Sequence, residues 1–122
     1  MNRLKGLIGL IGLMLVLSNL NIASASFYDA GTLADFCKEH IKFADLEEEH
    51  DRLAAGICQG YLASKIEVMT LSQELCQRET LNLDQLAIDV VAYASEEPQR
   101  ATVSAIRVVV EVLQANHGCT LD

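Results

Sequence analysis

Apolar residues recur at helical spacing along most of the chain, and the first such stripe lies between residues 32 and 41. Its members stand at i, i+3, i+4, i+7 and i+8, which predicts one face of a helix: Leu33, Phe36, Cys37, His40 and Ile41. Thr32 and Asp35 have the spacing of a capping box at its start. Because His40 lies on the apolar stripe, we expect a packed, hydrogen-bonded histidine rather than a catalytic base.

A second and longer helix is predicted to begin at Asp45 as its N-cap. The residues Glu47–Glu49 would then lie in the first turn, where the helix dipole favours acids. Its predicted apolar face is Leu46, His50, Leu53, Ile57, Tyr61, Ser64, Val68 and Leu71.

Two glycines four positions apart, Gly56 and Gly60, interrupt this helix. Each costs about 1 kcal/mol relative to alanine, so a helix crossing at close backbone distance is expected to compensate. We therefore interpret Gly56, Gly60 and Tyr61 as the centre of the core. A ligand pressed against the bare backbone is the alternative.

The second half of the chain predicts two more helices after a connector at 74–81. Asn82 and Gln85 have capping-box spacing, and Pro98 ends the third helix and suits the first turn of the fourth. The third stripe is Leu83, Leu86, Ala87, Val90, Val91 and Ala94. The fourth is Val103, Ile106, Val110 and Leu113, widened by Val108, Val109 and Val112. Gly118 is expected as a left-handed stop. The predicted fold is all-α, a compact bundle of about four helices.

Residues 1–25 have the pattern of a cleaved signal peptide. Arg3 and Lys5 precede an apolar run that is short for a membrane span, and Ala23-Ser24-Ala25 has the small-x-small pattern of a cleavage site. We expect a single mature domain over residues 26–122, exported to the periplasm, with no stable membrane anchor after cleavage.

All four cysteines lie in the expected mature chain, and an even count in an oxidising compartment predicts two disulfides. Sequence alone permits three pairings. If the last two helices form an antiparallel hairpin turning between Glu97 and Pro98, position 119 lies opposite position 76. That arrangement favours Cys76–Cys119, which leaves Cys37–Cys58 to join the first two helices.

Charge and composition argue against nucleic-acid binding and against catalysis. The chain has 17 acidic and nine basic residues, and two of the basic ones, Arg3 and Lys5, would be removed with the signal peptide. Such a surface repels nucleic acid and favours a basic partner or simple solubility. With the cysteines oxidised no thiolate remains, and their spacing does not predict a zinc site. We expect no enzyme, no metal and no cofactor.

The order of several residues resembles the Rap/Tai family of type VI secretion immunity proteins. The residues that carry it are Cys58-Gln59-Gly60-Tyr61, Cys76, Leu86, Val90-Val91, Tyr93, Glu97-Pro98, Ala101, Ala105 and Cys119. The resemblance implies a periplasmic, helical, disulfide-bonded protein that binds a toxin, typically a peptidoglycan amidase, and blocks its cleft. Some members act as dimers, so it also allows a homodimer. Arg78 and His117-Gly118 depart from the family pattern and leave the recognised toxin open.

Two polar segments are candidates for partner contact. One is the expected hairpin tip, with Ser95, Glu96, Glu97 and Gln99, and the other is the acidic helix start, with Glu47 and Glu48. For each, an exposed charged turn is the alternative. A small periplasmic chaperone of the acid-stress type is the alternative function, because such proteins are also short, helical, exported and disulfide-bonded.

Overall fold

The structure, a computed structural model, describes residues 27–119. These residues form four α-helices and a 3-10 helix: α2 (Ala30–Ala44), α3 (Arg52–Leu71), α4 (Leu83–Glu96), η2 (Pro98–Thr102) and α5 (Ala105–His117). The predicted all-α fold is confirmed. The expected signal peptide at 1–25 lies outside the described residues. Within the described part, no helix is long and apolar enough to cross a membrane.

Short polar side chains start three of the helices. The Asp29 carboxylate accepts from Thr32 N at 2.7 Å, and the Asp51 carboxylate accepts from Ala54 N at 3.1 Å. Asn82 Oδ1 accepts from two backbone amides at the start of α4, as its sequence position predicts. The prediction for α2 was slightly wrong, since Asp29 rather than Thr32 is the N-cap.

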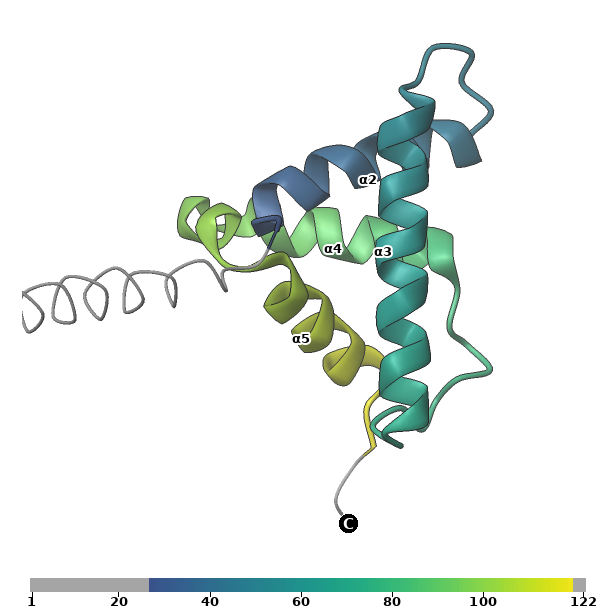
Figure 1. Cartoon of the computed structure of the whole chain (residues 1–122), viewed down its shortest axis with the longest axis vertical. Helices are drawn as coiled ribbons and strands as arrows, with labels where there is room; N and C mark the ends of the chain where they lie inside the picture. Colours follow the sequence, from purple (N-terminus) through teal and green to yellow (C-terminus); the bar gives the residue numbers. More distant parts are fainter. Residues whose placement is uncertain (1–26, 120–122) are drawn as a thin grey trace, which may run out of the picture.

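The predicted start of the second helix at Asp45 is wrong. Asp45 ends α2, and Leu46 follows with a φ of 60°. Leu46 N donates to Phe43 O, and Glu47 N donates to Lys42 O at 2.9 Å, the pattern of a Schellman motif. These bonds end α2, so the acids expected in a first helical turn lie instead in a loop over residues 45–51. Figure 1 shows this loop projecting beyond the helices at the top of the view.

The core lies where α2 meets α3 and α4, with α5 closing it from below in Figure 1. Its largest fully buried apolar side chains come from all four α-helices: Leu33, Leu62, Val90, Val108, Val109 and Leu113. The Cys37–Cys58 disulfide lies within this core and joins α2 to α3. Cys76–Cys119 joins the α3–α4 connection to the end of the described chain. Both favoured pairings are confirmed.

The predicted inner face of α3 is wrong. The buried side chains of this helix are Ala54, Ala55, Cys58, Leu62 and Met69. Leu53, Val68 and Leu71, which the predicted face included, are exposed. The buried stripe is rotated by about a third of a turn from the predicted face, so Leu53, Val68 and Leu71 lie outside while Tyr61 stays half-buried at the edge of the core.

Helix α5 starts later than predicted and presents a different face. Val103 is outside it, in the link from η2, and Ile106 is 43% exposed. Val108 and Val109 are buried, and the run Val108–Val110 is helical as expected. Gly118 is not left-handed, since its φ is −66°. A methyl group there would overlap the Gln114 carbonyl oxygen, and this close approach explains the glycine.

Candidate partner-binding sites

The first candidate site is the tip between α4 and η2. Ser95, Glu96, Glu97 and Gln99 are all exposed there. Glu97 is extended, and Pro98 begins the 3-10 helix, so the connection is broader than the expected two-residue turn. The structure brings these four residues together on one projecting end of the molecule, near the start of α2 (Figure 1).

Arg100 fixes the tip to the body of the protein. Its guanidinium lies 4.0 Å from the Tyr93 ring centroid and donates to Tyr93 O at 3.2 Å. The same group is hydrogen-bonded to Glu96, and it lies 3.8 Å from Glu97. Cation–π and charge-assisted contacts of this kind hold a side chain in one orientation. Arg100 is not among the residues predicted from the sequence, although its position three residues after Glu97 allows an ion pair on one helical face.

Tyr93 also connects the tip to α5. Its hydroxyl donates to Glu111 at 2.5 Å, and Arg107 Nε donates to the same carboxylate at 3.1 Å. The hydrogen bond from Tyr93, with a smaller contribution from Arg107, holds the pKa of Glu111 below its ordinary value. The same bond raises the pKa of Tyr93, since it stabilises the protonated phenol. The tip is therefore connected to α5 through the contacts among Arg100, Tyr93 and Glu111.

The second candidate site is the loop over residues 45–51, after α2. Glu47 and Glu48 are exposed on it. At its end, the Glu39 carboxylate accepts from Asp51 N at 2.8 Å and from Lys42 at 2.9 Å. The backbone bond is the main reason why the pKa of Glu39 is lowered.

The loop over residues 45–51 follows the end of α2, whereas the tip lies near the start of this helix. A helix of 15 residues separates them by about 20 Å, so the two sites do not form one surface.

Gly56 and Gly60 do not form the centre of the core, which corrects the sequence prediction. Both are exposed, and a Cβ added to either would meet nothing within 4 Å. Tyr61 is half-buried and packs against the core, with its ring 6.1 Å from that of Tyr28. No close helix crossing within the described chain explains the two glycines.

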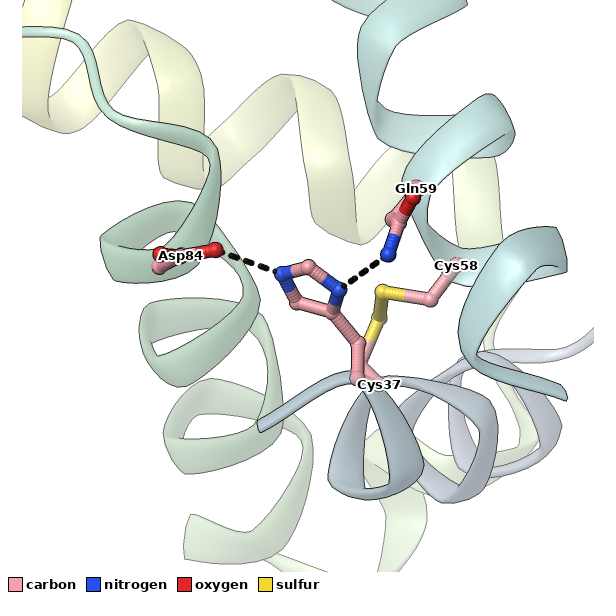
Figure 2. Close-up of a disulfide and its surroundings, with 5 residues drawn as sticks. Cys37, Cys58, Gln59 and Asp84 are labelled. Atoms are coloured by element: carbon pink, nitrogen blue, oxygen red, sulfur yellow. Dashed lines mark hydrogen bonds and ion pairs between the residues drawn. A yellow bond between two sulfur atoms is a disulfide. The ribbon is translucent and has the colours of Figure 1, made fainter. Parts of the chain in front are cut away.

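His40 is buried and hydrogen-bonded, as its place on the apolar stripe predicts. Its Nε2 lies 2.7 Å from Asp84 Oδ1, and its Nδ1 lies 2.9 Å from the Gln59 amide nitrogen. A carboxylate only accepts, so Nε2 carries the proton and Nδ1 accepts from Gln59. Figure 2 shows the ring held between Asp84 and Gln59, beside the Cys37–Cys58 disulfide. The arrangement joins α2, α3 and α4, and both ring nitrogens are used in doing so.

The described residues hold neither a free thiol nor a cluster of metal ligands. Over residues 27–119 all cysteines are paired, and no three His, Cys, Asp or Glu side chains gather as metal ligands. The described part is a small, disulfide-bonded helical domain with two exposed acidic projections. In a comparison with known protein families, the family model of Rap1a immunity proteins matches residues 29–119. The chain belongs to this family. No curated protein sequence matches it.

Family membership has two direct consequences. The chain is an immunity protein, an inhibitor of a cognate type VI effector, and not an enzyme. The resemblance found in the sequence is confirmed, and immunity is favoured over the chaperone alternative.

Proposed function

We propose that the protein is a periplasmic immunity protein that binds a peptidoglycan amidase and occludes its catalytic cleft without turnover. The family match over residues 29–119 is the observation that carries this proposal. The net charge of −8 supports it, because an enzyme that approaches the anionic cell wall gains from a basic surface, which an acidic inhibitor complements.

The tip formed by Ser95, Glu96, Glu97 and Gln99 is the proposed occluding element. It projects, it is polar, and Arg100 holds it in one conformation before binding. Pre-ordering reduces the entropy lost when the tip enters a cleft. Glu47 and Glu48 are proposed as a second contact, on the loop at the other end of α2.

The test measures binding and inhibition of the purified cognate amidase on peptidoglycan. The double variant Glu96→Gln/Glu97→Gln is expected to weaken binding about tenfold or more, as expected for charge pairs of this kind. Glu67→Gln/Glu79→Gln is the matched control, with the same charge change at exposed positions away from the tip. Equal effects of the two double variants, or binding insensitive to salt, would contradict the proposal.

We also propose that the protein is exported, because residues 1–25 have the pattern of a signal peptide. Mass spectrometry of the mature protein tests this. The mature protein recovered from the periplasm is expected to begin at Ser26, which follows the predicted cleavage site. A cytoplasmic protein that retains Met1–Ala25 would refute both the cleavage and the location.

We also propose a homodimer through the outer stripe of α3, defined as Leu53, Ile57, Gly60, Ser64, Val68 and Leu71. Val68 is 59% exposed and Leu71 is 85% exposed. Gly60 and Ser64 leave room for a second helix to approach, which supplies the close crossing that the fold itself lacks.

Charge supports a second copy as the occupant of this stripe. Two acidic molecules repel each other over most of their surfaces, but α3 carries only Arg52, Lys65 and Glu67. Val68→Glu is expected to shift the mass measured by light scattering from dimer to monomer. Ile88→Glu, at a 44% exposed apolar position on α4, is the control and should leave it unchanged. A monomeric wild-type protein at high concentration would exclude the dimer.

A further inference from the structure

A hollow lies between the end of α2 and the start of α3, apart from the occluding tip. Its volume is about 390 Å³, and its lining residues are Phe43, His50, Arg52, Ala55, Gly56 and Gln59. Phe43 supplies an apolar wall and is 49% exposed. Gly56 has no side chain, so the α3 wall is open at that position.

The walls of the hollow are held in place by contacts that do not involve a ligand. The Phe43 and His50 rings meet edge to face at 5.3 Å, and His50 Nδ1 donates to Glu47 O at 3.0 Å. On the opposite wall, Gln59 is held by its hydrogen bond to His40. A hollow with fixed walls binds with a small entropy loss, so it is suited to receive a partner side chain.

Leu46 adds a second apolar group at this end of the molecule. It follows Phe43 by three positions, its N–H bonds to Phe43 O, and it is 88% exposed. An exposed phenylalanine and leucine so close together provide more apolar contact area than scattered surface residues do. The fold itself buries neither.

The charge around this apolar surface indicates the partner. The loop that carries Leu46 holds five carboxylates: Asp45, Glu47, Glu48, Glu49 and Asp51. Arg52 is a basic group on the wall, and Lys42 is already paired with Glu39 at 2.9 Å. The hollow has an apolar part, formed by Phe43 and Ala55, and it lies beside an acidic loop. It therefore fits an apolar side chain whose neighbouring lysine or arginine reaches the loop carboxylates.

We infer that the hollow and Leu46 form a second docking surface, which binds a basic segment of the toxin with an apolar side chain, outside the toxin's catalytic cleft. This inference rests on the proposed function. The hollow lies about 20 Å from the tip, at the other end of α2. A small protein domain spans that distance, so one toxin molecule reaches both surfaces. The tip then blocks the cleft, and the hollow adds affinity and selects the toxin.

The test uses two pairs of matched variants in binding measurements with the purified cognate toxin. Leu46 and Gln73 both have a φ of 60° at a helix end, so glycine relieves the same backbone strain at both positions. We expect Leu46→Gly and Gln73→Gly to fold at least as stably as wild type, and only Leu46→Gly to weaken toxin binding, about tenfold. Gly56→Leu fills the hollow and should also weaken binding, whereas Gln114→Leu, which adds the same side chain at an exposed position on α5, should not.

Several outcomes would overturn the inference. If Leu46→Gly and Gly56→Leu bind the toxin like wild type, while Glu96→Gln/Glu97→Gln weakens binding, the tip acts alone and the proposed function stands. If Leu46→Gly converts a dimer to a monomer, the surface belongs to self-association. If the wild-type protein does not bind the toxin at all, the proposed function fails together with the docking surface.

Discussion

The glycines at positions 60 and 118 differ in what a side chain would meet. Gly60 lies on the open side of α3, and a Cβ there has free space around it. Gly118 follows α5, and a Cβ there would overlap the Gln114 carbonyl oxygen. At Gly60 the intrinsic cost of glycine in a helix therefore determines the effect of a substitution on stability. At Gly118 the steric overlap determines it.

We therefore expect opposite effects from the same substitution. Gly60→Ala should stabilise the monomer by up to about 1 kcal/mol, because alanine favours the helix and nothing within the fold is displaced. Gly118→Ala should destabilise it, since the backbone must move away from Gln114. Urea unfolding measures both. Destabilisation by Gly60→Ala at low protein concentration would contradict this prediction, whereas destabilisation only at high concentration would support the proposed dimer.

His40 illustrates how a single buried polar residue joins elements. It is 3% exposed and bridges Asp84 on α4 and Gln59 on α3. Its burial and bonding were predictable from its position in an apolar stripe. Its partners were not, because they lie 44 and 19 positions away in sequence and depend on how the helices cross.

Helix caps give a prediction at the scale of one element. Asn82 accepts two backbone N–H groups at the start of α4. Ser104 occupies the corresponding position of α5, but its hydroxyl makes no capping bond and is buried without a partner. We expect Asn82→Ala to cost about 1 kcal/mol of unfolding free energy and Ser104→Ala to cost under about 0.5 kcal/mol. Equal losses in urea unfolding would show that the Ser104 hydroxyl does cap α5 in solution.

The orientation of α3 shows where sequence reasoning stopped. This helix has two apolar stripes, one with Leu53, Val68 and Leu71 and one with Ala54, Cys58 and Leu62. Periodicity identifies both and cannot choose between them. The choice follows from the Cys37–Cys58 bond, which requires Cys58 to face α2. Cys58 and Leu62 therefore face inward, and Leu53, Val68 and Leu71 are left outside.

Helix ends were predictable only where the chain used common signals. Asn82 and Pro98 lie at or next to the ends that their sequence positions indicate. The end of α2 falls at Asp45-Leu46, where a leucine takes the left-handed conformation usually given to glycine. Because no glycine or proline marks that end, the acids after it were wrongly assigned to the next helix. The tip residues were located correctly, but Arg100, which holds them, was missed.

For the whole molecule, we predict loss of stability in acid. Hydrogen bonds hold the pKa values of Asp29, Glu39 and Glu111 below their ordinary values. A lowered folded-state pKa stabilises the fold above the unfolded pKa, and this contribution is lost as the pH falls through the folded value. The free energy of unfolding should thus be nearly constant above about pH 5 and fall below about pH 4. Glu39→Gln should reduce this dependence, and Glu79→Gln, at an exposed position, should not.

The two disulfides are expected to differ in their resistance to thiols. Cys37 and Cys58 are fully buried, whereas Cys76 and Cys119 are exposed. In excess thiol without denaturant, Cys76–Cys119 should be reduced first, and Cys37–Cys58 only when the domain unfolds. Alkylation followed by peptide mass mapping distinguishes the two bonds. Reduction of both at the same rate would indicate that the core opens readily.

The order of the four cysteines also bears on how the protein reaches its folded state. The first cysteine pairs with the second and the third with the fourth, so the two covalent rings follow one another without interleaving. When a chain enters an oxidising compartment N-terminus first, each cysteine can join the neighbour that emerges next, and the native bonds result. Exchange between wrong disulfides, which takes seconds to hours, is then not required. Export should accordingly yield both native disulfides even in cells that lack a disulfide isomerase, which peptide mass mapping of the exported protein measures.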